Sequence, residues 1–450
     1  MNVLLIALDT LRADHLGCYG YPRLTSPQID RLAARGVRFA NFFSPHIPTH
    51  PSFTTLHTGV DAMRHQVVSH AGKIELDASI PTLAELLKAR GYFTAAVDNL
   101  GRWFTRGFDA VLPYRWATDP RVAWRKAEAV NAQAITALDL VANQTRPWFL
   151  FVHYWDPHTP YLPPAPFDRM FYPGDPYDPA NRSMDPVFAF EPFREYFQQW
   201  MGGVTDIQFP VAQYDAEIAY LDTVLEHLFG RLSELGQEED TLIVLLSDHG
   251  EIMDEHEGYF DHHGLYDGNV RVPLILCLPG RLPAGRVVDG FAQTFDVAPT
   301  ILDLVGVGDV AGRVGMTGRS LLPHLDGASG PEYLHLTECT WMRKRAVRTR
   351  QWKLIRALEP DFHALPPVQL FDLAVDPCEQ RNLADDRPDV VRELTARIEE
   401  WVSRRRAETG MADPLETQRP TLHRIGEMKT AVPSDPKLDQ KLYAEGGRAD

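Results

Sequence analysis

The stretch Asn2-Val-Leu-Leu-Ile-Ala-Leu-Asp-Thr10 decides the fold class of this chain. Residues 3–8 are all apolar, and a charged residue follows them directly. Such a run is typical of a strand that is buried on both faces inside a parallel sheet. Three further segments have the same character: Trp148–His153, Thr241–Ser247 and Val272–Leu278. Their repetition predicts a sheet in which most strands are parallel.

Helical segments lie between these strands. The segment Asp215–Leu232 carries Leu221, Leu225 and Leu228 on one helical face, and Thr82–Ala89 is a shorter amphipathic segment. Strands that alternate with helices predict an α/β fold, with a doubly wound, mostly parallel sheet flanked by helices. Ligands bind beyond the carboxyl ends of the strands in such sheets. The residues that follow each strand are therefore the first candidates for a functional site.

Changes in composition and in the pattern of predicted strands and helices divide the chain into three regions. We expect residues 1–330 to form the α/β domain and residues 331–405 to form a small C-terminal α+β subdomain. Residues 406–450 are polar and predict an extended tail, which either wraps on a partner subunit of a homo-oligomer or is a disordered end. Residues 163–205 are rich in Pro, Asp and aromatic residues, and we expect this long insertion to shape a substrate pocket.

Composition narrows the class of protein. The 450 residues include 45 Lys and Arg against 61 Asp and Glu, a formal charge of −16, which disfavours a nucleic-acid partner. The four cysteines lie far apart, which argues against a disulfide framework or a cysteine zinc site. The sequence shows no leader pattern and no apolar run of membrane-spanning length, so we expect a cytoplasmic protein with no membrane partner.

Three polar features follow predicted strands: Asp9, the pair Asp248-His249, and Asp156-Pro-His158. A single aspartate at a strand end often caps a helix, but an Asp-His pair directly after a buried strand is rarer. Gly250 supplies the turn that lets both side chains of the pair reach one ion. Carboxylate and imidazole ligands together suit Zn²⁺, Mn²⁺ or Fe²⁺ better than Ca²⁺, which prefers oxygen alone.

Thr49 lies just before Pro51 and Ser52, which are expected to open a helix. A hydroxyl at this position meets the unpaired N–H groups and the positive end of the helix dipole, where a phosphate or sulfate group would be favoured. The alternative is that Thr49 is an ordinary helix cap.

Several ordered motifs resemble the sulfatase branch of the alkaline phosphatase superfamily. The opening residues 2–20 are similar to its first strand and loop, and Thr49-His-Pro-Ser-Phe…Thr58-Gly59 occupies the slot of the signature Cys-x-Pro-Ser-Arg…Thr-Gly. Residues 266–273 match a second signature, and residues 369–383 resemble the carboxy-terminal subdomain of the family. The resemblance covers about 400 residues and implies an alkaline phosphatase-like sheet.

Departures from the family pattern bear on the function. Sulfatases use a formylglycine made from Cys or Ser, and Thr49 cannot become that aldehyde, so it would act as a plain alkoxide. Phe53 occupies the position of the signature Arg, and Thr10 occupies the position of the second Asp that is usual in the first loop. The Asp-Asn pair of calcium sulfatases is here Asp248-His249. These changes shift the expected chemistry toward the phosphodiesterases and phosphonate monoester hydrolases of the superfamily.

The resemblance implies one metal site, formed by Asp9, Asp248 and His249 with Thr49 as the nucleophile on the ion. The cofactor would be Mn²⁺ or Zn²⁺, with Fe²⁺ as a further candidate. Contact with the ion would lower the pKa of the threonine hydroxyl and orient it for attack.

Two interpretations of the remaining polar residues stay open. In the first, Asp156, His158 and His263 hold a second metal ion. In the second, His158, His262 and His263 grip the substrate oxyanion or protonate the leaving group. His262 takes the place of a lysine of sulfatases, and His153 ends a strand beside the site.

The resulting expectation is a metal-dependent hydrolase of small-molecule phosphoric esters. The substrate would be a phosphodiester, a phosphonate monoester or a monoester, and a phosphoryl-threonine would form on Thr49 and be released by water. A sulfuric ester hydrolase and a phospho-group transferase are the alternatives within the superfamily. A non-catalytic binding protein is the alternative from another class, against which the retained Asp9, Asp248 and His249 argue.

Overall fold

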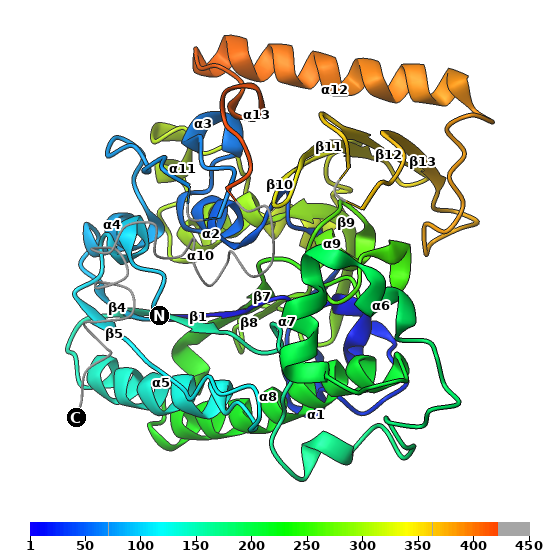
Figure 1. Ribbon diagram of the computed structural model, residues 1–450. Coiled ribbons are helices and arrows are strands. Elements are labelled where there is room, and N and C mark those ends of the chain that lie inside the picture. The colour runs from blue at the N-terminus through cyan, green and yellow to red at the C-terminus, as the bar shows by residue number, and fades with distance from the viewer. Residues whose placement is uncertain (71, 362, 422–450) are drawn as a thin grey trace.

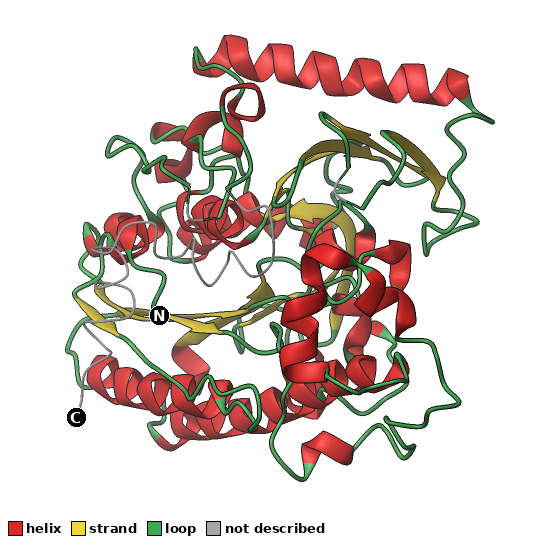
Figure 2. Ribbon diagram, in the orientation of Figure 1, coloured by secondary structure: helices red, strands yellow, loops and turns green. Residues whose placement is uncertain are grey.

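The computed structural model describes residues 1–70, 72–361 and 363–421. Its larger sheet has the strand order β5-β4-β6-β1-β7-β8-β2-β9 (Figures 1 and 2). In chain order its strands are β1 (Asn2–Leu8), β2 (Val37–Phe43), β4 (Phe93–Val97), β5 (Ala110–Leu112), β6 (Trp148–Tyr154), β7 (Thr241–Ser247), β8 (Leu274–Cys277) and β9 (Arg286–Gln293).

Most strand pairs of this sheet are parallel, which confirms the predicted fold class. The exception is β8, which runs antiparallel to both β7 and β2. Strands β1, β6 and β7 lie side by side at the centre, with Leu8 opposite both Tyr154 and Ser247. The residues that follow these three strands therefore meet at one edge of the sheet.

Helices cover both faces of the sheet (Figure 2). The helices are α1 (Pro27–Arg35), α2 (Thr49–Thr58), α3 (Ala62–His65), α4 (Leu83–Lys88), α5 (Lys126–Ala142), α6 (Asp185–Ala189), α7 (Glu191–Met201), α8 (Gln208–Glu234), α9 (Asp267–Val270), α10 (Val297–Leu304), α11 (Asp309–Arg313), α12 (Pro388–Thr409) and α13 (Pro414–Thr417). The predicted helix 215–232 is the larger part of α8, and the predicted insertion 163–205 contains α6 and α7.

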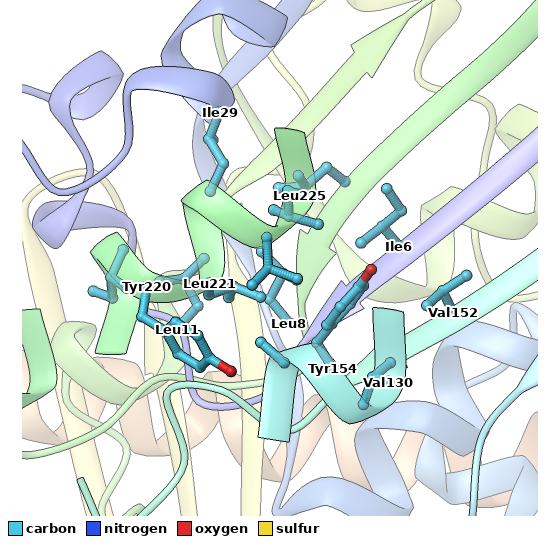
Figure 3. Close-up of a cluster of buried hydrophobic side chains, with 14 of the residues drawn as sticks. Ile6, Leu8, Leu11, Ile29, Val130, Val152, Tyr154, Tyr220, Leu221 and Leu225 are labelled. Atoms are coloured by element: carbon cyan, nitrogen blue, oxygen red, sulfur yellow. The ribbon is translucent and has the colours of Figure 1, made fainter. Parts of the chain in front are cut away.

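The side chains of β1 alternate between two hydrophobic cores. Leu4, Ile6 and Leu8 pack in the core that lies beneath α1, α5 and α8. Val3, Leu5 and Ala7 pack in the second core, beneath α2, α4 and α10. Figure 3 shows the first core, where Ile6 and Leu8 face Leu221 and Leu225 of α8. Because both faces of β1 are buried, its sequence is apolar without alternation.

A second sheet lies beyond the first, with the order β13-β12-β11-β10-β3. Its strands are β3 (His46–Ile47), β10 (Leu334–Cys339), β11 (Arg343–Arg348), β12 (Trp352–Ala357) and β13 (Val368–Asp372). β10 to β13 form antiparallel pairs, and α12 lies across them (Figure 1). β3 comes from the N-terminal part of the chain and pairs in parallel with β10. The sheet of the predicted C-terminal subdomain is thus completed by residues just before Thr49.

The predicted extended tail begins differently in the structure. Helix α12 continues to Thr409, and α13 follows at Pro414. Leu415 packs against Ala62, Val68 and Cys339, which holds this part of the chain on the protein surface. Residues 422–450 of the predicted tail lie outside the described residues. In the described part of the chain, no helix is both long and apolar enough to cross a lipid bilayer.

The core beneath α8 predicts a stability effect. Leu221 is fully buried, so Leu221→Ala should leave a cavity and lower the free energy of unfolding by about 2–5 kcal/mol. Leu24→Ala is the control, because this side chain is 76% exposed and its loss should change stability by at most about 0.5 kcal/mol. Urea unfolding followed by circular dichroism measures both, and equal effects would contradict the assigned core.

Candidate active site

The pairing of β1 with β7 brings two carboxylates together. Leu8 and Ser247 are opposite each other, and the next residues of the two strands are Asp9 and Asp248. Ligand atoms of Asp9, Asp248 and His249 all lie within 4.8 Å of one another, and each residue is fully buried. Among the residues that the structure describes, no other group of three His, Cys, Asp or Glu residues is arranged this way.

The charge of this group fits a cation. Asp9 Oδ1 and Asp248 Oδ2 are buried and have no hydrogen-bond partner. Burial, together with the negative charge of Asp9, raises the pKa of Asp248 to about 7. Burial opposes ionisation of Asp9 as well, but the hydrogen bond from His153 and the charges of nearby histidines lower its pKa below the usual range. A divalent ion would pair with both orphaned oxygens.

His249 is oriented for such an ion. Its Nδ1 lies 3.0 Å from the carbonyl oxygen of Gly250, to which it can donate a hydrogen bond. That assignment leaves the lone pair of Nε2 directed at the carboxylates, 3.3 Å from Asp248 Oδ2 and 3.9 Å from Asp9 Oδ1. A backbone carbonyl that fixes the tautomer of a ligand histidine is a common support in metal sites.

Thr49 belongs to the same group of atoms. It is the first residue of α2, and its Oγ1 lies 3.2 Å from Nε2 of His249. Helix α2 is fixed to the end of β7, because the hydroxyl of Ser52 donates to the carbonyl oxygen of Asp248 at 2.7 Å. The structure therefore brings together the four residues that the sequence predicted for the first metal site.

His153 lies behind Asp9 and makes two contacts with carboxylates. Its Nε2 is 3.3 Å from Asp9 Oδ2, and its Nδ1 is 2.9 Å from Asp98 Oδ1. Burial disfavours the charged ring, but the hydrogen bonds and charges of the two aspartates raise its pKa to about 9. Phe53, which stands in the slot of the signature Arg, packs on this ring at 4.6 Å between ring centroids. His153 thus supports Asp9 from its place at the end of β6, and the prediction that it also contacts the substrate stays a prediction.

Two histidines lie over the metal-binding group. The ring of His262 stacks on His249 at 4.8 Å, and the ring of His158 lies 5.2 Å from His262. Burial lowers the pKa of His262 to about 3 and also lowers that of His158, so both rings are neutral at pH 7. The predicted contact of both residues with the substrate stays a prediction.

The structure does not bring together Asp156, His158 and His263, the residues predicted for a second metal ion, as it does Asp9, Asp248 and His249. Asp156 faces the N-terminus of α5, where the ammonium group of Lys126 is 4.0 Å from its Oδ1. His263 turns the other way, with Nδ1 3.0 Å from Asp261 Oδ2 and its ring stacked on His363 at 4.1 Å. Each of these two side chains has a partner of its own, and the predicted contact of His263 with the substrate stays a prediction.

Sequence reasoning missed Asp98 and His70. Asp98 directly follows β4, so the rule that polar residues after strands are candidates would have found it. His70 lies close enough to Asp9, His158 and His249 for their charges to act on its pKa, which burial lowers to about 4. Its ring stacks on His50 at 4.2 Å. His70 lies in the loop between α3 and α4. The sequence indicated a place near the site only because His70 is 21 residues from Thr49.

Two protein-family models match this chain. The sulfatase family model matches residues 1–307, more than half of the chain. The chain belongs to the sulfatase family. A model described as the C-terminal region of N-sulphoglucosamine sulphohydrolase matches residues 254–407 of this sulfatase-family protein. The recognition of the family from sequence motifs is thereby confirmed.

Relatives of this sulfatase-family protein include enzymes that are named for different activities. It is 26% identical over 434 residues to a choline-sulfatase of Rhizobium meliloti, covering 86% of this chain and 82% of the relative. It is 28% identical over 478 residues to the multifunctional alkaline phosphatase superfamily protein PehA of Trinickia caryophylli, covering 86% and 91%.

Solved structures that resemble this protein include two phosphonate monoester hydrolases. The phosphonate monoester hydrolase of Agrobacterium radiobacter superposes with a TM-score of 0.71 at 25% identity, covering 90% of this chain and 96% of the other. The phosphonate monoester hydrolase from Silicibacter pomeroyi gives 0.69 at 26% identity, covering 92% and 96%. This sulfatase-family protein is therefore a hydrolase from the superfamily that acts on sulfate and phosphonate esters. Enzymes of this family use a divalent metal, and the Asp9 group offers a place for one.

The two carboxylates around His153 predict a pH-dependent stability of the metal-free protein. The folded-state pKa of about 9 exceeds the unfolded value of about 6.5, so this contribution is complete below about pH 6.5 and is lost as the pH rises through 9. Asp98→Asn removes one carboxylate and should reduce the loss. Urea unfolding of wild type and of Asp98→Asn from pH 6 to 9.5 gives the free energy of unfolding of each protein at each pH. The decrease between pH 6 and 9.5 should be smaller in the variant.

Asp385→Asn, at an exposed carboxylate, is the matched control and should follow the wild-type curve. If the Asp98→Asn and wild-type curves ran parallel across this range, the assigned charge on His153 would be wrong.

Proposed function

We propose that this protein is a metal-dependent hydrolase of phosphoric esters, acting on phosphodiesters or phosphonate monoesters through Thr49. The observation that carries the proposal is an unmodified threonine hydroxyl 3.2 Å from Nε2 of His249, beside two buried carboxylate oxygens without partners. No cysteine or serine occupies position 49, so the aldehyde chemistry of sulfatases is not available there.

The bound metal has a defined place in this proposal. Asp9, Asp248 and His249 would hold a divalent ion, which lowers the pKa of the Thr49 hydroxyl and offsets negative charge on the phosphoryl group. One imidazole with two carboxylates suits Mn²⁺, Zn²⁺ or Fe²⁺ better than an all-oxygen set would. We therefore expect one of these ions, with Mn²⁺ and Zn²⁺ as the first candidates.

The chain's own residues carry the two chemical steps. Oγ1 of Thr49 forms a bond to phosphorus while the bond from phosphorus to the leaving-group oxygen breaks. In the second step, water forms a bond to phosphorus and the bond to Thr49 breaks, which restores the hydroxyl. Splitting hydrolysis in this way replaces one difficult step by two easier ones.

Proton transfer in both steps is assigned to the neutral histidines. His158 Nδ1 can donate to the carbonyl oxygen of Thr159 at 2.8 Å, so Nε2 is the nitrogen that takes a proton. In the first step, His158 accepts the Thr49 proton and delivers it to the leaving-group oxygen. In the second step, it accepts a proton from the attacking water and returns it to Oγ1 of Thr49. His262, stacked on His249, is placed to contact the phosphoryl oxygens.

The plain hydroxyl at position 49 supports phosphorus over sulfur. A sulfatase releases sulfate by breaking a C–O bond of its formylglycine hydrate, whereas an ester on Thr49 is released only by water that attacks the central atom. A divalent ion held by Asp9, Asp248 and His249 would activate that water for attack on phosphorus. Hydrolysis of sulfuric esters is the second candidate, favoured by the similarity to a choline-sulfatase. We further propose that the substrate is a small molecule and that the protein acts in the cytoplasm.

Removal of the nucleophile tests the proposal. Thr49→Val keeps the shape of the side chain without its hydroxyl and should lower kcat for an aryl phosphodiester by about 10³-fold or more. Thr49→Ser retains the oxygen and should stay within about tenfold of wild type. In wild type, rapid-quench mass spectrometry should detect a phosphoryl group on the peptide that contains Thr49.

A substrate panel separates the candidate activities. We expect kcat/KM for aryl phosphodiesters or phosphonate monoesters to exceed that for aryl sulfates. A higher value for sulfates would favour the sulfuric ester hydrolase, and transfer to an added alcohol in place of water would favour the transferase. No turnover of any of these substrates would favour a binding protein.

Metal removal tests the assigned ligands. Chelation should abolish turnover and lower Tm, and Mn²⁺ or Zn²⁺ at 100-fold its Kd should restore about 2.7 kcal/mol of stability. Asp248→Asn should lose most of this metal-dependent increase in Tm. A full increase in that variant would exclude Asp248 as a ligand.

A further inference from the structure

Three charged side chains are buried together beside the reaction centre but outside the metal-binding group. Lys126 is the first residue of α5, Asp156 follows β6, and Glu217 lies in α8. Each of the three residues is at most 1% exposed. Burying ionised groups costs several kcal/mol each unless their charges are compensated nearby. A cluster retained at this cost invites a functional explanation.

The cluster holds both ends of the segment 158–162, which begins with the proposed catalytic histidine. At one end, Nζ of Lys126 donates to the carbonyl oxygen of His158 at 2.5 Å. At the other end, Oε1 of Glu217 accepts from the amide of Leu162 at 2.7 Å. Between them, the ring of His158 is fixed by its contact with the carbonyl oxygen of Thr159 at 2.8 Å.

The charges of the cluster balance if one proton is shared. Two carboxylates and one ammonium group leave a net charge of −1, and a proton on Glu217 brings the sum to zero. Both oxygens of Asp156 and Oε2 of Glu217 are buried without a donor, which is the arrangement that a proton between the two carboxyl groups would satisfy. Burial and the proximity of Asp156 raise the pKa of Glu217 well above its usual value, although Lys126 acts in the opposite direction.

We propose that Lys126, Asp156 and Glu217 form a neutral buried clamp that positions His158. In the clamp, Glu217 donates its proton to Asp156, and Lys126 faces the remaining negative charge. The three residues touch no reacting atom, so they are positioning residues. The inference rests on the role of His158 in the proposed function.

A matched pair of variants tests the clamp. The amide nitrogen of Glu217→Gln can donate to Asp156, and its oxygen can still accept from Leu162. This variant should keep kcat/KM within about threefold of wild type. Glu217→Leu has a similar size but neither hydrogen bond, and it should lower kcat by tenfold to a hundredfold with little change in KM. Equal losses in the two variants would overturn the shared proton.

A double-mutant cycle with His158→Ala shows whether the effect passes through the histidine. In the His158→Ala background, Glu217→Leu should cause less than a threefold further loss of kcat, because positioning has no remaining target. Losses that multiply in full would show that Glu217 acts elsewhere and would overturn the proposal. If Glu217→Leu does not fold, Lys126→Met takes its place in the cycle.

Two readouts do not depend on turnover. Nitrogen NMR of the histidine rings should show His158 protonated at Nδ1 in wild type and in Glu217→Gln, and mixed tautomers in Glu217→Leu. Elemental analysis should find one metal ion per chain in wild type and in Asp156→Asn. An unchanged tautomer in Glu217→Leu, or loss of a metal ion in Asp156→Asn, would overturn the clamp. Failure of the proposed function would instead appear as a wild type that turns over no ester.

Discussion

The in-register pairing of β1 with β7 is the constraint on which the site depends. It places the carboxylates of Asp9 and Asp248 side by side in a fully buried position, where like charges repel strongly. Folding alone does not relieve this repulsion, since one oxygen of each carboxylate has no partner. The apolar strands that stabilise the sheet therefore also create a local demand for positive charge. A divalent cation would meet that demand, which is the place that the proposed function gives to the metal.

Charge compensation continues away from this centre in two directions. Behind Asp9, a cationic His153 lies between Asp9 and Asp98. Behind the segment that carries His158, the ammonium group of Lys126 faces Asp156. Both are cations supplied by the chain itself, and they are fixed by elements on the two faces of the sheet. These ion pairs thus link the ends of β1, β4 and β6 to one another and to helix α5.

The sequence was informative where the cause is local. An apolar run can be recognised without knowing its neighbours, so β1 and β7 were predicted with their observed bounds. The same rule located Asp9 and Asp248, because a residue after a strand has a known place in a parallel sheet. Asp156 satisfies this rule equally well, yet its side chain turns toward Lys126, some 30 residues earlier. Pairings between distant side chains, like that of His70 with the centre, leave no periodic signal.

Strand β3 links the position of Thr49 to the second sheet. Its two residues form an edge of the second sheet, and Thr49 follows after a single proline. The hydroxyl that we propose as the nucleophile is therefore attached to a sheet whose other strands come from residues 334–372. Separating the two sheets would detach the start of α2 from its β3–β10 pairing, so the proposed nucleophile depends on both sheets for its position.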